Sequence, residues 1–178
     1  MKESLSEILI LSLKKAIPLL LALFFVLAFC VPLPFPSSHY FRPDLAAACL
    51  YFWVLYRPDL FSVLSVVILG MASDGVSGTP FGLNLMAFVL MYVLTLTYGS
   101  YVNTKPFLVS WFGFAVVFLA GLFAKWLILS VYYKTFLLTE HIYLTYMATV
   151  LIYPLVARIN IFVQNQYLRF EGDLNEQR

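Results

Sequence analysis

The sequence predicts an all-α membrane protein, built as a single domain of six transmembrane helices over residues 1–178. The first reason is composition, since 62% of the 178 residues are hydrophobic, against about 45–50% in soluble domains. The second is charge, since only 11% of the residues are charged, against about 25% in soluble domains. A soluble chain of this size could not bury so much apolar surface, because roughly a third of its chain surface stays exposed after folding. Lipid is therefore the expected solvent.

Long stretches without a charged side chain mark the first spans, at residues 16–41, 75–104, 106–124 and 142–157. About 20 helical residues cross the roughly 30 Å of hydrocarbon in a bilayer. The first three stretches are long enough, and the fourth is long enough if Arg158 extends its charge to the interface. The sequence thus predicts four secure spans.

Between them lie two shorter apolar pieces, at residues 45–56 and 60–73. Both open with Arg-Pro-Asp-Leu, at residues 42–45 and 57–60. Proline suits the first position of a helix, and an aspartate there favours the positive end of the helix dipole. Two such start signals predict two short helices rather than one long helix kinked at Pro58.

The positions of the basic residues also favour six helices. With an even number of crossings both termini share one side of the membrane, and lysine and arginine favour the cytoplasm. A single kinked span in place of the two short helices would divide the basic residues almost evenly. A re-entrant hairpin gives the same parity as two full crossings, so the depth of crossing stays open. In the six-helix arrangement the cytoplasmic side collects Lys2, Lys14, Lys15, Arg57, Lys105, Arg158, Arg169 and Arg178, against Arg42 and Lys134 outside.

The two ends are expected to differ from the bundle of residues 16–164. Residues 1–15 carry a capping-box pattern and apolar side chains at helical spacing, which is typical of an amphipathic helix on the inner surface. Residues 165–178 read as a polar cytoplasmic tail.

Signatures of catalysis, cofactors and metals are missing from the sequence. The histidines, His39 and His141, have no metal-ligand spacing, and the cysteines, Cys30 and Cys49, read as small hydrophobic residues. The net charge of +2 is too small, and the basic residues too scattered, for a nucleic-acid binder. We expect a non-enzymatic protein without a cofactor.

Two ionisable residues at or near membrane depth are functional candidates by default, Asp74 and Lys125. Lys125 lies about 30 Å along a helix from Lys105, which places it at the outer interface, where a structural role is sufficient. Asp74 would lie at the negative end of the third helix, so its charge needs compensation. The start of a fourth helix at Thr79–Pro80 would supply free N–H groups at Gly82 and Leu83, and Lys125 is an additional candidate partner.

Glycines are the other structural candidates. Gly78 would allow the turn before the fourth helix to fold back, and Gly82 would let the two backbones approach. Gly113 and Gly121 lie on similar faces of the fifth helix and offer a smooth strip. Helices in lipid associate through close packing, so we expect this strip to pack against another helix, inside the bundle or from a partner.

The stretch Arg42-Pro43-Asp44-Leu45, then Tyr51-Phe52-Trp53 and Arg57-Pro58, followed by the spaced series Gly70, Asp74, Gly78 and Gly82, resembles the bacterial MreD family of rod-shape-determining proteins. The resemblance is close over residues 40 to 90 and agrees in size and topology elsewhere. It implies a non-catalytic subunit of the cell-elongation machinery in the inner membrane, with MreC as direct partner. MreB, RodA and a class B penicillin-binding transpeptidase belong to the same assembly, and the family fold is similar to the substrate-binding subunits of energy-coupling-factor transporters. The candidate structural or interaction residues are Asp44, Arg57, Asp59, Gly70, Asp74, Gly78, Gly82, Gly113, Gly121 and Lys125.

That similarity of fold supplies one alternative, a vitamin-binding subunit of a transporter. A vitamin site would need convergent polar groups that open to the outer face. The candidates for it are few, namely Asp74, Asn84, Lys125 and Glu140. A membrane enzyme is a third alternative, for which the sequence offers no catalytic motif.

Overall fold

The computed structural model describes residues 5–28, 43–102, 104–134 and 142–176, and side chains from residue 16 to residue 166 within those ranges. In these ranges the chain folds into six α-helices and no strand, which confirms the predicted class. The helices are α1 (Leu5–Ala28), α2 (Leu45–Tyr56), α3 (Val63–Ser77), α4 (Leu83–Val102), α5 (Phe107–Tyr133) and α6 (Ile142–Glu176).

The short helix α2 forms the centre of the bundle. All of its residues from Ala46 to Leu55 are buried, and it contacts α1, α4, α5 and α6. Its sequence has small residues at Ala46–Ala48 and large rings at Tyr51–Trp53, with no charged side chain between its ends. A helix that is apolar all round is suited to burial on every side.

Three helices are long and apolar enough to cross a membrane within the described residues: α4, α5, and residues 142–166 of α6. The predicted span at residues 75–104 is shorter than expected, because a turn at residues 78–82 separates α3 from α4. Of the predicted span at residues 16–41, the part from 16 to 28 is helical and residues 29–42 lie outside the described ranges.

Two separate short helices, α2 and α3, occupy the region where the sequence predicted them. The repeated Pro-Asp-Leu signal begins only the first one, with Asp44 as N-cap rather than inside the helix. At the second copy, Pro58 and Asp59 lie in a turn and α3 starts later, with Ser62 as N-cap. The start predicted at Pro58 is therefore wrong, since the chain first buries Leu60 and Phe61 in the core before the helix begins.

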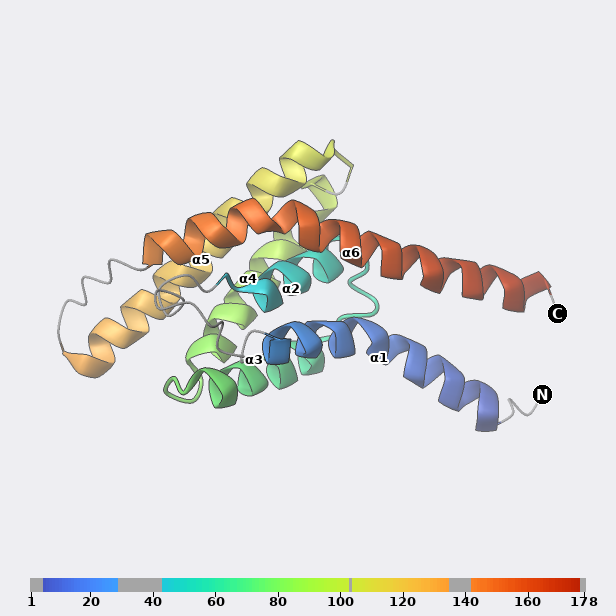
Figure 1. Ribbon diagram of the computed structural model, residues 1–178, viewed down its shortest axis with the longest axis horizontal. Coiled ribbons are helices and arrows are strands. Elements are labelled where there is room, and N and C mark those ends of the chain that lie inside the picture. Colours follow the sequence, from blue (N-terminus) through green and yellow to red (C-terminus); the bar gives the residue numbers. More distant parts are fainter. Residues whose placement is uncertain (1–4, 29–42, 103, 135–141, 177–178) are drawn as a thin grey trace.

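Both ends of the chain are continuous with helices of the bundle. The lead-in and the first span form one helix, α1, and the segment expected to be a polar tail continues α6 as far as Glu176. The N-terminal end of α1 and the C-terminal end of α6 extend past the bundle toward the same side (Figure 1).

Candidate functional site

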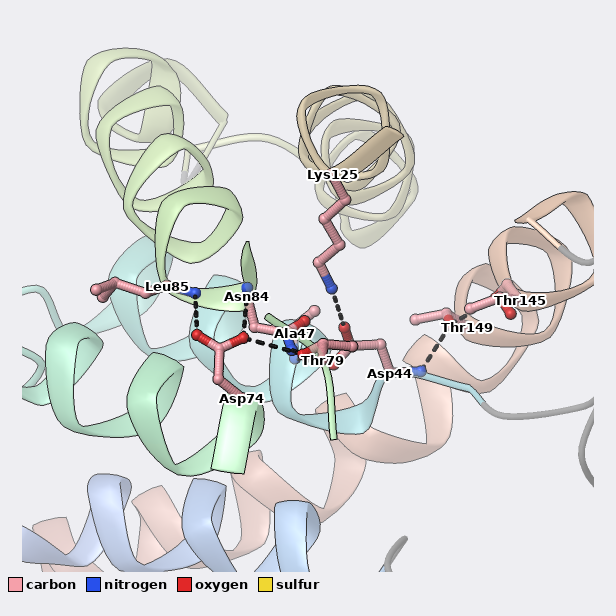
Figure 2. A network of polar contacts seen from close by, with 9 residues as sticks. All are labelled: Asp44, Ala47, Asp74, Thr79, Asn84, Leu85, Lys125, Thr145 and Thr149. Carbon is pink, nitrogen blue, oxygen red and sulfur yellow. Dashed lines mark hydrogen bonds and ion pairs between the residues drawn. The ribbon is translucent and has the colours of Figure 1, made fainter. Parts of the chain in front are cut away.

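Asp74 lies in the last turn of α3 and is almost completely buried, with 1% of its surface exposed. Its carboxylate accepts hydrogen bonds from the backbone N–H groups of Gly82 and Asn84, each at 2.8 Å. The hydroxyl of Thr79 donates a third bond at 3.2 Å, and the N–H of Leu85 is at the limit of bonding at 3.5 Å. Figure 2 shows the carboxylate pointing into the start of α4. One side chain thus ties the end of α3 to the beginning of α4.

The local sequence explains this arrangement. Gly78 ends α3 in the left-handed conformation, with φ of 64°, and Gly82 also has a positive φ, of 99°. Glycine adopts these angles without the strain that a Cβ would cause. The first N–H groups of α4 have no partner within their own helix, and the helix dipole is positive there, so a carboxylate is favourable.

The sequence predicted this capture but not all of its details. The bond from Gly82 is confirmed. The second predicted donor, Leu83, is wrong, because its N–H bonds to the carbonyl of Pro80 at 3.2 Å. The start at Thr79–Pro80 is also wrong, since the positive φ of Gly82 interrupts the helical backbone and α4 begins at Leu83. A Cβ added at Gly82 would meet no other atom within 4 Å, so the positive φ of the turn, and not a close approach of two backbones, requires this glycine.

Lys125 pairs with Asp44 at 3.1 Å, and not with Asp74. Asp74 already has its donors from α4, whereas Asp44 stands at the start of α2, facing α5. The other oxygen of Asp44 caps α2 by accepting from the N–H of Ala47 at 3.0 Å. The ammonium also lies 5.4 Å from the centre of the Phe88 ring on α4. The predicted pair of Lys125 with Asp74 is therefore corrected to a pair with Asp44.

The sixth helix joins the same arrangement through Thr149. The backbone N–H of Asp44 donates to the Thr149 hydroxyl at 2.9 Å, and that hydroxyl donates to the carbonyl of Thr145 at 2.6 Å. Figure 2 draws the contacts of Asp44 together with those of Asp74. Asp44 stands at the start of α2 and Asp74 in the last turn of α3, and we call this end of the bundle the acidic end. At the acidic end, polar contacts link α2, α5 and α6 through Asp44, and α3 and α4 through Asp74.

Arg57 and Asp59 are not part of the acidic end, because they follow the opposite end of α2. They form an ion pair of 3.1 Å with the two side chains 21% and 59% exposed. The structure therefore divides the sequence-predicted charged residues between the two ends of α2.

The glycine strip on α5 faces the interior. A Cβ added at Gly121 would lie 3.0 Å from the Met91 side chain of α4, and one at Gly113 would lie 2.6 Å from the Tyr51 hydroxyl of α2. At Gly70 on α3 a Cβ would lie 2.6 Å from a backbone atom of Leu85 on α4. Packing of the strip inside the bundle, one of the two predicted possibilities, is confirmed.

Sequence reasoning missed a second set of buried polar contacts, between α2, α5 and α6. The Cys49 thiol donates to the side-chain oxygen of Asn160 at 3.3 Å, so Cys49 is more than a small hydrophobic residue. The Tyr51 hydroxyl donates to the carbonyl of Ser110 at 3.1 Å. Ser110 and Asn160 are isolated polar residues in apolar stretches. They could have indicated these contacts, because a polar group in lipid needs a hydrogen-bond partner.

The polar groups of this arrangement bond to other parts of the protein. Among the described residues there is no group of three His, Cys, Asp or Glu side chains that could hold a metal. Asp74 accepts from the backbone N–H of Asn84, and the Asn84 side-chain amide donates to the Thr79 hydroxyl. Lys125 bonds to Asp44. Three of the four polar groups considered for a vitamin site are thus used within the protein, while the fourth, Glu140, lies outside the described residues, as do His39 and His141.

Comparison with known proteins agrees with this picture. No curated protein and no solved structure matches the chain. Residues 11–166 match the family described as rod shape-determining protein MreD, a range that includes all or most of every helix. The chain therefore belongs to the MreD family, the non-catalytic, multi-pass proteins of the bacterial inner membrane that take part in determining rod shape.

Proposed function

We propose that the chain is a subunit of the cell-elongation machinery that binds MreC directly and helps to organise peptidoglycan synthesis. The observation that carries the proposal is the family match over residues 11–166. MreB, RodA and a class B penicillin-binding transpeptidase are partners at the level of the assembly. The chain acts by binding and positioning these partners. Its buried polar groups stabilise the helix arrangement that presents the binding surface.

Both termini are proposed to lie in the cytoplasm. The even number of helices in the described residues supports this topology, as does the shared direction of the N-terminal end of α1 and the C-terminal end of α6 (Figure 1). The prevalence of basic residues on the same side supports it independently. In this topology the acidic end faces the periplasm, and the pair of Arg57 and Asp59 faces the cytoplasm.

The acidic end is proposed to keep the periplasmic surface rigid for a partner. Asp74 fixes the hairpin of α3 and α4, and Asp44 fixes the start of α2 against α5 and α6. A surface that is already ordered before binding loses less conformational entropy when a partner docks. A partner that binds at this end would therefore depend on the two carboxylates indirectly, through the helix positions that they fix.

The fold is proposed to be related to the substrate-binding subunits of energy-coupling-factor transporters, as the family resemblance implies. We do not extend this relation to vitamin binding. Three of the four polar groups considered for such a site, Asp74, Asn84 and Lys125, are bonded to other parts of the chain.

The proposal is tested by co-purification from bacterial membranes. An affinity-tagged copy of the chain should retain MreC after detergent extraction, whereas an unrelated six-helix membrane protein with the same tag should not. In cells that lack their own copy, the untagged gene should restore rod shape. The proposal would be contradicted if the cells kept their abnormal shape and the purified sample contained no MreC.

A further inference from the structure

The outer face of α3 is apolar and uncovered by the rest of the protein. Leu64, Ile68 and Met71 are 67%, 40% and 52% exposed and follow one another at helical spacing. The opposite side of the helix, with Val66 and Leu69, is fully buried against the bundle. In a membrane protein such a stripe faces the hydrocarbon of the lipids. The length of α3 therefore limits the thickness of the hydrocarbon that it can contact.

Helix length sets an upper limit on that thickness. With 15 residues, α3 rises about 22 Å from end to end, and any tilt makes its height smaller. The hydrocarbon of a typical bilayer is about 30 Å thick. On another side of the bundle, α4 and α5 have 20 and 27 residues, which is enough for the full thickness.

α3 is bounded by charged and polar groups at one end and by a turn at the other. On the side of its N-terminus are the ion pair of Arg57 and Asp59 and the exposed N-cap residue Ser62. The Asp59 side chain is 59% exposed, and a charged carboxylate is strongly disfavoured in hydrocarbon. At the other end, the helix stops at the turn that starts at Gly78, which includes the exposed Phe81. The helix therefore cannot be lengthened at either end.

α1 packs beside α3 and also carries exposed apolar side chains, Leu20, Phe24 and Leu27. The length of the uncovered surface is therefore argued from α3 alone, and we call the stripe of Leu64, Ile68 and Met71 the α3 face.

We propose that the α3 face thins the bilayer beside it, by about 8 Å relative to the side of α4 and α5. Lipid headgroups move toward one another there to meet Asp59 at one end and the turn at Gly78 at the other. The ligand of this face is a ring of phospholipids, with a preference for short acyl chains. The proposal is independent of MreC binding, because it concerns the protein alone in lipid.

The first test measures depth with nitroxide spin labels on purified protein in nanodiscs, on a background in which Cys30 and Cys49 are replaced. Labels at Leu64→Cys and Val76→Cys sample the two ends of the stripe on α3. Labels at Phe112→Cys and Phe123→Cys are the matched pair on α5, with similar spacing and 71% and 59% exposure of the native side chains. All four positions face outward, so the labels do not disturb the core.

We expect both α3 labels to be several-fold more accessible to a polar nickel chelate than both α5 labels. Equal accessibility of the two pairs would overturn the proposal. A deep label at residue 64 with a shallow label at residue 76 would also overturn it, because α3 would then enter the bilayer from one side without thinning it.

The second test measures thermal unfolding in short-, medium- and long-chain phosphatidylcholine. The wild-type protein should be most stable in the short-chain lipid. Asp59→Leu removes the charge that limits the hydrocarbon and should move the optimum to a longer chain, whereas Asp59→Asn keeps a polar group and should leave it unchanged. An optimum in the long-chain lipid for the wild type, or identical optima for all three proteins, would overturn the proposal.

Discussion

Replacing Asp74 by leucine removes the acceptor that joins α3 to α4 while keeping a side chain of similar size. In the native protein both carboxylate oxygens are used, one for the N–H of Gly82 and the other for the N–H of Asn84. Both donors stand at the start of α4, with Asn84 buried and Gly82 partly buried, and no partner within their own helix can replace the lost acceptor. The substitution therefore leaves two backbone groups without a hydrogen bond.

The size of the effect follows from these contacts. Hydrogen bonds to a charged group contribute about 1.5–3 kcal/mol each, so two bonds amount to about 3–6 kcal/mol. Removing the buried carboxylate also removes its desolvation penalty, which is several kcal/mol for a buried ion. The expected net loss in the free energy of unfolding is about 1–3 kcal/mol. Asp74→Asn should give an intermediate loss, because its one oxygen can serve only one of the two N–H groups.

The assay is denaturant-induced unfolding of the purified protein in detergent, followed by tryptophan fluorescence. Asp59→Asn is the control, since it alters an exposed ion pair and should change stability by about 0–1 kcal/mol. An Asp74→Leu protein that unfolds at the same denaturant concentration as the wild type would refute the reasoning. If that protein also failed to restore rod shape, the carboxylate would be a contact for a partner instead of a structural acceptor.

Three further changes have expected outcomes. Lys125→Met should lower the free energy of unfolding by about 1–2 kcal/mol, because the ion pair with Asp44 is mostly shielded from water. In a double-mutant cycle with Asp44→Asn, additive losses would contradict a direct interaction between the two side chains. Gly70→Ala should destabilise by about 1–3 kcal/mol, since its Cβ would meet the α4 backbone, whereas Gly121→Ala meets only a flexible methionine and should melt close to the wild type. A fluorescent protein fused to the C-terminus should fluoresce and alkaline phosphatase fused there should be inactive, while the reverse pattern would disprove a cytoplasmic C-terminus.

Several features could be predicted from the sequence because their causes are local. Runs without charge reveal which segments can enter lipid, and breaks in those runs separate the helices. The bond between Asp74 and Gly82 joins residues eight positions apart, and the glycines between and beside them indicate a tight turn. The carboxylate at the negative end of α3 needs a positive partner, and the start of α4, a few residues later, offers free N–H groups. A short-range contact therefore satisfies both.

The tertiary structure alone decided which distant groups meet. Lys125 and Asp44 are 81 positions apart, and nothing in either segment distinguishes Asp44 from Asp74 as the partner. Two copies of Pro-Asp-Leu have the same local preferences, yet Asp44 caps a buried helix and Asp59 lies in an exposed turn. The central position of α2 was equally hidden, because residues that face lipid and residues that face other helices are both apolar, so the periodic signal that marks the buried side of a soluble helix is missing. In such a chain the inward faces are set by small residues and close packing, which only the assembled bundle reveals.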